Sequence, residues 1–386
     1  MFFEFLDYIE SQEHKILRNN VRKFVESKVA PISRKMDEED YFPVDLFKEM
    51  GELGFTGMLI PEEYGGIGED VLNAIIILEE ISKESPALAL SLLAHSVLCA
   101  YPIVKYGNEE QKRYYLPKLA SAEFIGGLAY TEPNAGSDAE NIITKAILKD
   151  DYFYISGSKN FITNGSIADV LIVYARTGGP GKDGISAFIF DTKNEGFYVS
   201  KKLDKLGMRG SPTALLYFDN AKVSRDKLLG ELNRGYYMVV KGFEIERITI
   251  SAISTGIALR CIEWMVKYSK ERKAFSKPIS EYQLIQEKVA RISSKLEVLR
   301  TYLYLSAKYY NPEKDNRVKA STLKYLCGKL GVEAGLEAIQ VLGGYGYTKD
   351  YIVEKLMRDA KLNDIGAGTT EMMILQLSKI AYRYFK

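Results

Sequence analysis

The sequence has few of the side chains on which most metal sites and nucleophilic triads depend. Its 386 residues include two histidines, three cysteines and one tryptophan. With only His14 and His95, a histidine-rich metal site or a Ser-His-Asp triad is hard to assemble. Cys99, Cys261 and Cys327 lie far apart and fit no metal or disulfide spacing. We therefore expect no metal, and we expect catalysis to rest on carboxylates or on a cofactor.

Neither sign of charge is in excess. The chain has 52 Lys and Arg residues against 51 Asp and Glu residues, so it lacks the strongly basic surface of a nucleic-acid-binding protein. Residues 1–15 mix apolar and acidic residues without a basic region, which argues against a secretory signal. An odd number of cysteines favours a reducing compartment, and we expect a cytoplasmic protein.

The longest apolar run covers residues 86–104. A membrane span needs about 20 predominantly apolar residues, so this run is borderline in length. It also contains His95 and serines, and Pro102 interrupts it near its end. We therefore expect a buried core helix and no membrane span.

The pattern of apolar residues divides the chain into three regions. Residues 1–122 show helical spacing, residues 123–235 contain short β-rich runs separated by turns, and residues 236–386 return to helical spacing. Short runs at short intervals are typical of an antiparallel sheet or barrel. The predicted fold is α+β and mostly α, with an N-terminal helical domain, a central antiparallel β domain and a C-terminal helical domain.

Two polar segments in the β-rich region have the chemistry of a ligand site. Residues 128–138 combine the hydroxyls of Thr131 and Ser137 with Gly136, where the backbone can approach a ligand. Residues 161–165 place an aromatic ring beside a hydroxyl and a turn. Such groups could hold the edge of a heterocycle or a pyrophosphate, although ordinary loops have the same composition. Neither segment resembles a P-loop or a Rossmann fingerprint.

Seven segments together resemble signatures of the acyl-CoA dehydrogenase family, and they occur in the family's order across nearly the whole chain. They are YTEPNAGSD at 130–138, FITNG at 161–165, KLGMRGS at 205–211, ERKAF at 271–275, QVLGGYGY at 340–347, VEKLMRDAK at 353–361 and GAGTTE at 366–371. The resemblance implies a C-terminal four-helix bundle, FAD as cofactor, an acyl-CoA substrate and a homo-oligomer, expected to be a tetramer. It also implies electron-transferring flavoprotein as the electron acceptor.

The resemblance assigns FAD contacts residue by residue. It places Thr131 and Thr163 at the isoalloxazine edge and Arg272 at the pyrophosphate, a role that suits a planar cation. Arg272 could otherwise be a helix-end arginine in a charged run. Gln283 and residues 340–344 match positions that reach the FAD of a neighbouring subunit. The implied cofactor contacts are Leu128, Tyr130, Thr131, Gly136, Ser137, Phe161, Ile162, Thr163, Arg272, Phe275, Gln283, Gln340, Gly343, Gly344, Thr369 and Glu371.

Two positions depart from the family pattern. Phe161 stands where the family usually has tryptophan beside the flavin, and Ser276 stands where it usually has glycine. Phenylalanine keeps an aromatic wall but offers less stacking area and no indole donor. We expect both departures to affect the tuning of the flavin more than the function of the protein.

The catalytic base is not where many family members carry it. Their glutamate precedes Gly-Thr near the C-terminus, and Ala367 stands at that position here. The branch that includes isovaleryl-CoA and long-chain dehydrogenases supplies the base from another helix, and its position matches Glu246. The resemblance adds substrate contacts at Ser137, Tyr237, Glu244, Arg247, Ala367 and Gly368.

Helical spacing independently singles out Glu246. Six residues fall on one stripe: Val239, Phe243, Glu246, Ile250, Ile253 and Ile257. Glu246 is the only charge in this stripe, whereas Glu244 lies off it and is expected to face polar groups. A buried ion pair with an arginine would explain such an acid, and so would a general base whose pKa is raised by burial.

The isovaleryl-CoA dehydrogenase branch is the most similar one, and small residues at Gly366 and Ala367 leave room for a branched acyl chain. The expected reaction is α,β-dehydrogenation of an acyl-CoA to the trans-2-enoyl-CoA, in fatty acid or branched-chain amino acid degradation. A short or medium straight-chain acyl-CoA is the alternative substrate. An acyl-CoA oxidase, a flavin monooxygenase and a non-catalytic flavin- or CoA-binding protein are competing functions.

Overall fold

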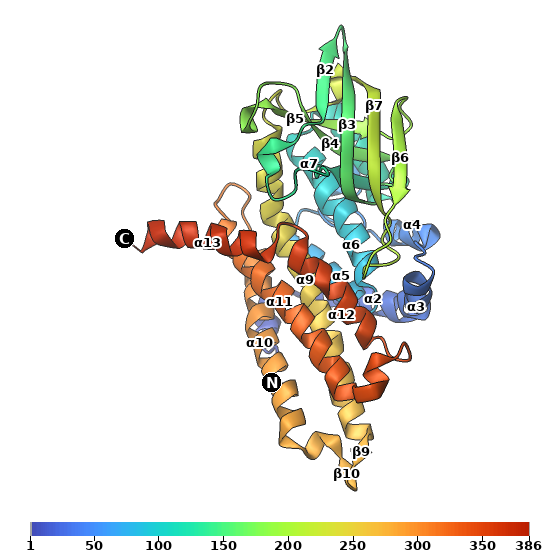
Figure 1. The fold of residues 1–386 in the computed structure, drawn as a ribbon, viewed down its shortest axis with the longest axis vertical. Helices are drawn as coiled ribbons and strands as arrows, with labels where there is room; N and C mark the ends of the chain where they lie inside the picture. The colour runs from blue at the N-terminus through green and yellow to red at the C-terminus, as the bar shows by residue number, and fades with distance from the viewer. Residues whose placement is uncertain (1, 386) are drawn as a thin grey trace.

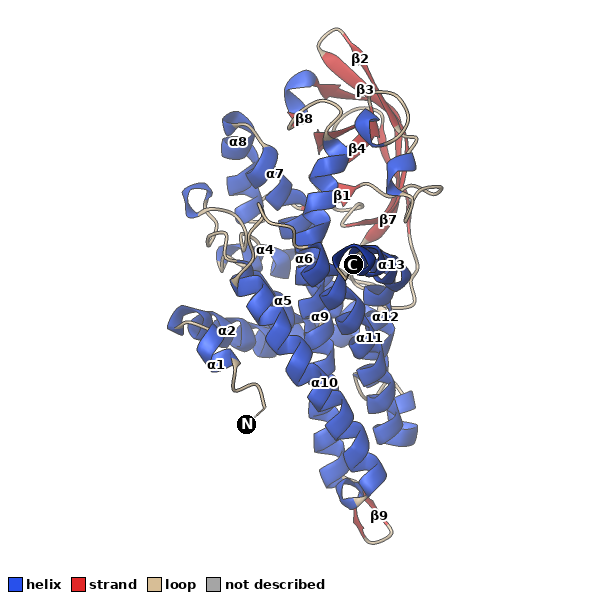
Figure 2. Ribbon diagram, turned by 90° about the vertical axis from the view of Figure 1, so that its left-hand side faces the viewer, coloured by secondary structure: helices blue, strands red, loops and turns tan. Residues whose placement is uncertain are grey.

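The computed structural model describes residues 2–385 and places the β-rich segment at one end of a long body of helices. In Figure 1 the strands lie at the top and the C-terminal helices run downward from them. Figure 2 shows the same division, with the strands gathered at one end apart from a small hairpin at the other. The predicted order of helix, β and helix along the chain is therefore confirmed.

The N-terminal region is helical, as predicted. Its helices are α1 (Leu6–Ile9), α2 (Gln12–Phe24), α3 (Ala30–Glu38), α4 (Val44–Glu52), α5 (Val71–Ser82), α6 (Pro86–Leu93), α7 (Tyr101–Tyr106) and α8 (Glu109–Ala120). Asp70 caps α5 by accepting a hydrogen bond from the backbone N–H of Leu72. Every residue of α5 except Asn73 is buried, so this helix forms part of the core.

The apolar run at residues 86–104 is a buried helix. The chain stays helical from Pro86 to Tyr106 because a π-helical segment, Ala94–Ala100, joins α6 to α7, and Pro102 lies in the first turn of α7. This stretch and α9 (Gly235–Glu271) are long and apolar enough to cross a membrane, but 94% and 72% of their apolar windows are buried inside the protein. Both are therefore core helices, as predicted for the first.

The sheet is mixed rather than antiparallel throughout. Its strands are β1 (Gly126–Ala129), β2 (Lys145–Lys149), β3 (Tyr152–Thr163), β4 (Val170–Arg176), β5 (Ile185–Asp191), β6 (Phe197–Lys202), β7 (Thr213–Ser224) and β8 (Leu228–Leu229). Most neighbours pair antiparallel, in the order β6-β7-β3-β2-β4-β5-β8. However, β1 pairs with β4 in parallel, and β2 touches β4 in parallel. The prediction of an antiparallel sheet is wrong at these pairings because the chain crosses through β2 and β3 before β4 returns alongside β1.

Glycine in β1 lets the helical layer approach the sheet. A Cβ on Gly126 would lie 2.6 Å from the sulfur of Cys99, which belongs to the π-helical segment between α6 and α7. No side chain fits at that separation. This close contact fixes the strand that leads into the polar loop at residues 130–138.

The C-terminal region is built from long helices. They are α9, α10 (Gln283–Lys308), α11 (Arg317–Leu342), α12 (Val353–Ile365) and α13 (Thr370–Tyr384). α9 begins against the sheet and ends at the β9–β10 hairpin (Lys273–Ala274 and Lys277–Pro278), at the opposite end of the molecule (Figure 1). α13 projects sideways from the bundle, and the C-terminal end of the helix lies away from the body (Figure 1).

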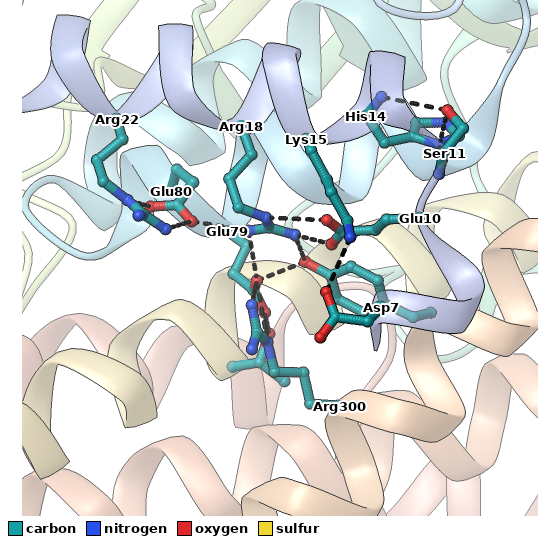
Figure 3. A network of polar contacts seen from close by, with 12 residues as sticks. Asp7, Glu10, Ser11, His14, Lys15, Arg18, Arg22, Glu79, Glu80 and Arg300 are labelled. Atoms are coloured by element: carbon teal, nitrogen blue, oxygen red, sulfur yellow. Dashed lines mark hydrogen bonds and ion pairs between the residues drawn. The ribbon is translucent and has the colours of Figure 1, made fainter. Parts of the chain in front are cut away.

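A buried polar network ties the N-terminal helices to the bundle (Figure 3). Glu79 of α5 has no exposed side-chain surface, and its carboxylate accepts hydrogen bonds from Arg18 of α2 and from Arg300 of α10. The hydroxyl of Tyr304 donates to the same carboxylate. Buried charges need such partners, and here the partners come from segments far apart in the sequence.

Candidate active site

Glu246 lies in the first half of α9 and is 7% exposed. Its Oε2 atom is buried and has no hydrogen-bond partner among the described residues. Burial raises the pKa of this carboxyl to about 7, although the nearby charges of Arg247 and Lys324 act to lower it. A carboxylate in this state is a candidate general base, because its proton affinity suits transfer near neutral pH.

The predicted apolar stripe on this helix is present. Val239, Ile250, Ile253 and Ile257 are at most 3% exposed and belong to the apolar core together with neighbours from other helices. The described residues give Glu246 no ion pair, so the alternative interpretation as half of a buried salt bridge is wrong. What remains is an acid placed on an apolar face without a partner that neutralises it.

The loop that contains Ala367 lies beside this part of α9. Arg247 donates from Nε to the main-chain oxygen of Ala367 at 3.1 Å and from Nη1 to Oε1 of Gln376 at 3.2 Å. Ala367 adopts a positive φ of 57°, and Gly368 follows with a φ of 90°. Such a turn directs main-chain groups away from helical bonding, so they are available to a ligand.

Glu244 is buried, which the stripe did not indicate. It is 3% exposed, and its Oε2 accepts hydrogen bonds from the backbone N–H of Asn316 at 3.3 Å and from Lys241 at 3.5 Å. The polar surroundings expected for it are therefore present. Tyr237, the predicted substrate contact, donates its hydroxyl to Asp183 in a turn of the β region at 2.7 Å.

A cavity of about 250 Å³ opens between α9, the sheet and the helices α6 to α7. Phe243, one helical turn before Glu246, lines it together with Leu98, Leu128, Met238 and Tyr101. Tyr310, whose hydroxyl interacts with that of Tyr101, also lines the cavity. Lys105, Lys241 and Glu313 also line it. Mostly apolar and aromatic walls with a few polar groups are typical of a site for a small organic group.

The segments predicted to hold the flavin ring lie at the C-terminal ends of β1 and β3. Thr131 and Thr163 are partly exposed, and Gly136 has open space where a Cβ would stand. Phe161 is 65% exposed at a positive φ of 59°, so its ring is presented at the surface. A partly exposed aromatic ring with two hydroxyls and an open glycine fits a planar heterocycle. Ile162 is buried beneath it, whereas Ser137 is exposed.

A buried ion pair that the sequence analysis missed supports this loop. Lys159 has no exposed surface, and its Nζ lies 2.8 Å from Oε1 of Glu132 and 2.9 Å from the main-chain oxygen of Tyr130. Burial lowers the pKa of Lys159 to about 8, while Glu132 opposes that shift. The available signal was Glu132 inside the YTEPNAGSD segment, since an acid in a loop that packs on a sheet needs a partner.

The other predicted cofactor residues gather at the far end of the bundle. Arg272, Phe275, Gln283, Gln340, Gly343 and Gly344 are all exposed there. The described residues offer the Arg272 guanidinium no hydrogen-bond partner, and Gly343 and Gly344 have open space around the position of a Cβ. From Glu246 to Arg272 α9 runs for about 39 Å at 1.5 Å per residue. One chain therefore does not bring both groups of residues to a single ligand.

Thr369 and Glu371 lie at the start of α13. The side chain of Thr369 caps this helix by accepting a hydrogen bond from the backbone N–H of Met372 at 3.3 Å. Glu371 is exposed, and hydrogen bonds from its own backbone N–H and from Thr369 lower its pKa. Both follow directly on the Ala367 loop, so they belong to the Glu246 end of the molecule.

The comparisons with known proteins agree across the chain. Family models for the acyl-CoA dehydrogenase N-terminal, middle and C-terminal domains match residues 11–123, 127–221 and 233–382. An acyl-CoA dehydrogenase of Bacillus subtilis (strain 168) is 42% identical over 96% of this chain and 98% of its own.

A mitochondrial isovaleryl-CoA dehydrogenase of Solanum tuberosum is 40% identical over 93% of this chain and 88% of its own. The structure of butyryl-CoA dehydrogenase from Megasphaera elsdenii superposes with a TM-score of 0.94 at 35% identity, over 97% of this chain and 99% of that one. The chain therefore belongs to the acyl-CoA dehydrogenase family, an enzyme family whose members depend on FAD.

Proposed function

We propose that this protein oxidises the α,β carbon–carbon bond of an acyl-CoA thioester, with Glu246 as the base that removes the α-proton. The observation that carries the proposal is the buried carboxylate of Glu246, whose Oε2 has no partner among the described residues. An acid without a structural partner on an apolar face, one helical turn from the cavity residue Phe243, is suited to proton transfer.

The residues around Glu246 divide the work of the reaction. The Glu246 carboxylate accepts the α-proton, and its pKa of about 7 keeps a large fraction of it ionised at neutral pH. Negative charge then develops on the thioester oxygen, and we assign the main-chain N–H of Ala367 as a donor to it. Arg247 holds that loop through the Ala367 oxygen. FAD, when bound, supplies the acceptor for the hydride that leaves the β-carbon.

We assign the flavin ring to the β-region segments and the remaining cofactor contacts to a second copy of the chain. Thr131, Phe161 and Thr163 present suitable groups at one end, and Arg272 lies at the other end of α9. A complete cofactor site then needs a neighbouring subunit, and we propose a homotetramer. Light scattering on the purified holoprotein tests the tetramer, because a monomeric flavoprotein would contradict it.

We propose a short branched-chain acyl-CoA as the substrate. The cavity of about 250 Å³ next to Phe243 accommodates a short acyl group, and small residues at Gly366 and Ala367 leave width near the α-carbon. The isovaleryl-CoA dehydrogenase among the relatives supports this choice. The butyryl-CoA dehydrogenase among the solved structures supports a short straight chain as the second candidate.

We also propose a cellular compartment, an electron acceptor and a pathway for this protein. Cys99, Cys261 and Cys327 are unpaired and buried, which fits a reducing cytoplasm. We propose electron-transferring flavoprotein as the acceptor and degradation of fatty acids or branched-chain amino acids as the pathway.

The experiment is an anaerobic titration of the purified yellow protein with a panel of acyl-CoA thioesters, following loss of the flavin absorbance. Rapid bleaching by isovaleryl- or isobutyryl-CoA would support both the reaction and the branched substrate. Bleaching by straight chains alone would retain the reaction and refute the branched substrate. No bleaching by any thioester would refute the dehydrogenase and favour a monooxygenase or a non-catalytic binding protein.

A further inference from the structure

A lysine lies buried close to the proposed base and has no ion pair. Lys324 of α11 is 1% exposed, and its Nζ donates to the main-chain oxygen of Asp364 at 3.3 Å. The described part of the chain places no carboxylate within salt-bridge distance of this ammonium group. Lysine is almost never fully buried unless it is paired, so the position of Lys324 needs a reason.

The packing of α11 places this lysine between α9 and the C-terminal end of α12. One turn after Lys324, a Cβ on Gly328 would lie 2.7 Å from the main-chain oxygen of Asn363, so α12 approaches α11 closely there. One turn before it, Ser321 donates to Oε1 of Gln376, the same atom that accepts from Arg247. This face of α11 is therefore joined to the Arg247 part of α9 and to the end of α12.

The carboxylate of Asp364, the residue whose main-chain oxygen accepts from Lys324, is already bound to other groups. Oδ2 of Asp364 lies 2.6 Å from Nζ of Lys361, and its Oδ1 accepts a hydrogen bond from the hydroxyl of Thr370. Lys324 meets only the main-chain oxygen of Asp364, at the C-terminal end of α12. A cation at that end of a helix interacts favourably with the unpaired carbonyl groups, and it steadies the start of the Gly366–Thr369 loop.

Two turns after Lys324, a Cβ on Gly331 would lie 3.6 Å from Ser254 of α9, which is itself two turns after Arg247, so Lys324 lies level with Glu246 and Arg247 where the two helices pack. The charged groups of this region come from several elements. Lys324 interacts electrostatically with Asp364 of α12, Glu371 of α13, and Glu246 and Arg247 of α9. The charged groups that act on Glu246 are Arg247 and Lys324. Burial lowers the pKa of Lys324 to about 8, so the ammonium form still dominates at neutral pH.

The two cations near Glu246 differ in what else they bind. Arg247 is committed to the Ala367 oxygen and to Gln376. The ammonium group of Lys324 has a single long hydrogen bond to a neutral carbonyl group, so its charge remains the less compensated of the two. Asp364 is the carboxylate with the largest effect on Lys324, but it is already bound to Lys361 and Thr370, so an ionised Glu246 adds to the balance of this charge.

We propose that Lys324 is a positioning residue for the dehydrogenation: its buried ammonium group anchors the end of α12 and holds the facing Glu246 carboxylate in the ionised form that accepts the α-proton. This inference rests on the proposed role of Glu246. A nearby cation stabilises the charged form of an acid. The fraction of enzyme ready to react below neutral pH then depends on Lys324, although Lys324 does not touch the substrate.

The test is the pH dependence of kcat/KM for the holoenzyme and two variants. Lys324→Met removes the charge and keeps most of the side-chain volume, and Lys329→Met removes an exposed lysine from the same helix. We expect Lys324→Met to shift the acidic limb of the kcat/KM profile to higher pH by about one unit. Well below that limb, kcat/KM should then fall about tenfold. The loss should disappear at high pH, and Lys329→Met should keep the wild-type profile.

A Lys324→Met profile that coincides with the wild type would overturn the inference, and so would an equal loss at every pH, which indicates a purely structural role. If Lys324→Met does not retain flavin, Lys324→Gln is measured instead and must show the same shift. Lys324→Arg, which keeps the charge, should leave the acidic limb in place. An inactive wild type would refute the proposed function, whereas an active wild type with an unshifted variant refutes only the role of Lys324.

Discussion

Arg247 donates a hydrogen bond from Nε to the main-chain oxygen of Ala367, 3.1 Å away. Glu246 is its immediate neighbour on α9, so the proposed base and the proposed donor to the thioester oxygen are held in one unit. Reactions that need two groups on one substrate gain most from such fixed geometry. Changes at Glu246 should therefore affect the chemical step far more than the binding of cofactor.

Glu246→Gln should retain FAD and lose turnover. The amide keeps the shape of the side chain but cannot accept the α-proton, and general-base catalysis contributes about 10²- to 10⁴-fold. The measurement is kcat with the acyl-CoA that bleaches the wild type, together with the flavin content of the purified variant. The matched control is Glu263→Gln, which removes an acid from the exposed side of the same helix, and its kcat should stay near the wild-type value. Wild-type turnover in Glu246→Gln would refute the base assignment.

The same carboxyl should make stability depend on pH. Its folded-state pKa of about 7 exceeds the ordinary value of 4.5, so the fold favours its protonated form, and ionisation of this carboxyl costs stability. The loss in the free energy of unfolding is absent below about pH 4.5 and grows as pH rises to about 7, where it reaches about 3 kcal/mol. Glu246→Gln should therefore gain stability over the wild type between these pH values, as measured by denaturant unfolding of both holoproteins. An equal difference at pH 5 and pH 8 would contradict the raised pKa.

The sequence allowed prediction of the apolar stripe around Glu246 because its signal is local. The stripe from Val239 to Ile257 requires only helical spacing along one segment, and Glu246 stands out within it. The burial of Glu244 depends on Asn316, which lies in the connection between α10 and α11 and has no periodicity. Lys324 presents the same difficulty, since its place opposite Glu246 depends on how α11 packs on α9.

The fold shows a similar limit. Most strands follow from their own alternation and turns, and they were predicted. The four residues of β1, Gly126–Ala129, carry too little pattern to reveal a parallel partner more than 40 residues away. The separation of Arg272 from the flavin segments likewise depends on the full length of α9. Pairings over long distances in the sequence come from tertiary packing, which local patterns do not encode.

Arg272→Ala should weaken FAD retention. The guanidinium is exposed and has no partner among the described residues, so its loss should cost the fold little while removing a bidentate phosphate contact. The measurement is the ratio of flavin to protein absorbance after gel filtration. Lys270→Ala, which removes an exposed cation from the last turn of the same helix, is the control and should keep its flavin. Full occupancy in Arg272→Ala would count against the proposed pyrophosphate contact.

Glu79→Gln should destabilise the protein strongly, because it leaves the guanidinium groups of Arg18 and Arg300 without their shared carboxylate (Figure 3). Breaking a buried pair by removing one partner costs about 3–5 kcal/mol. The control is Glu49→Gln, whose pair with Lys28 is exposed and is worth at most about 1 kcal/mol. Denaturant unfolding of both variants at pH 7 measures the difference.

Acid should abolish this difference, and the direction follows from the pKa of Glu79. The charges of Arg300 and Arg18 oppose the large effect of burial and lower that pKa from 4.5 to about 2. The stabilisation is therefore fully present above about pH 4.5 and is lost as pH falls toward 2. The wild type should approach Glu79→Gln in stability over that range, whereas Glu49→Gln should track the wild type throughout. If the stability difference between the wild type and Glu79→Gln persists unchanged to pH 3, the variant has lost packing contacts rather than charge interactions.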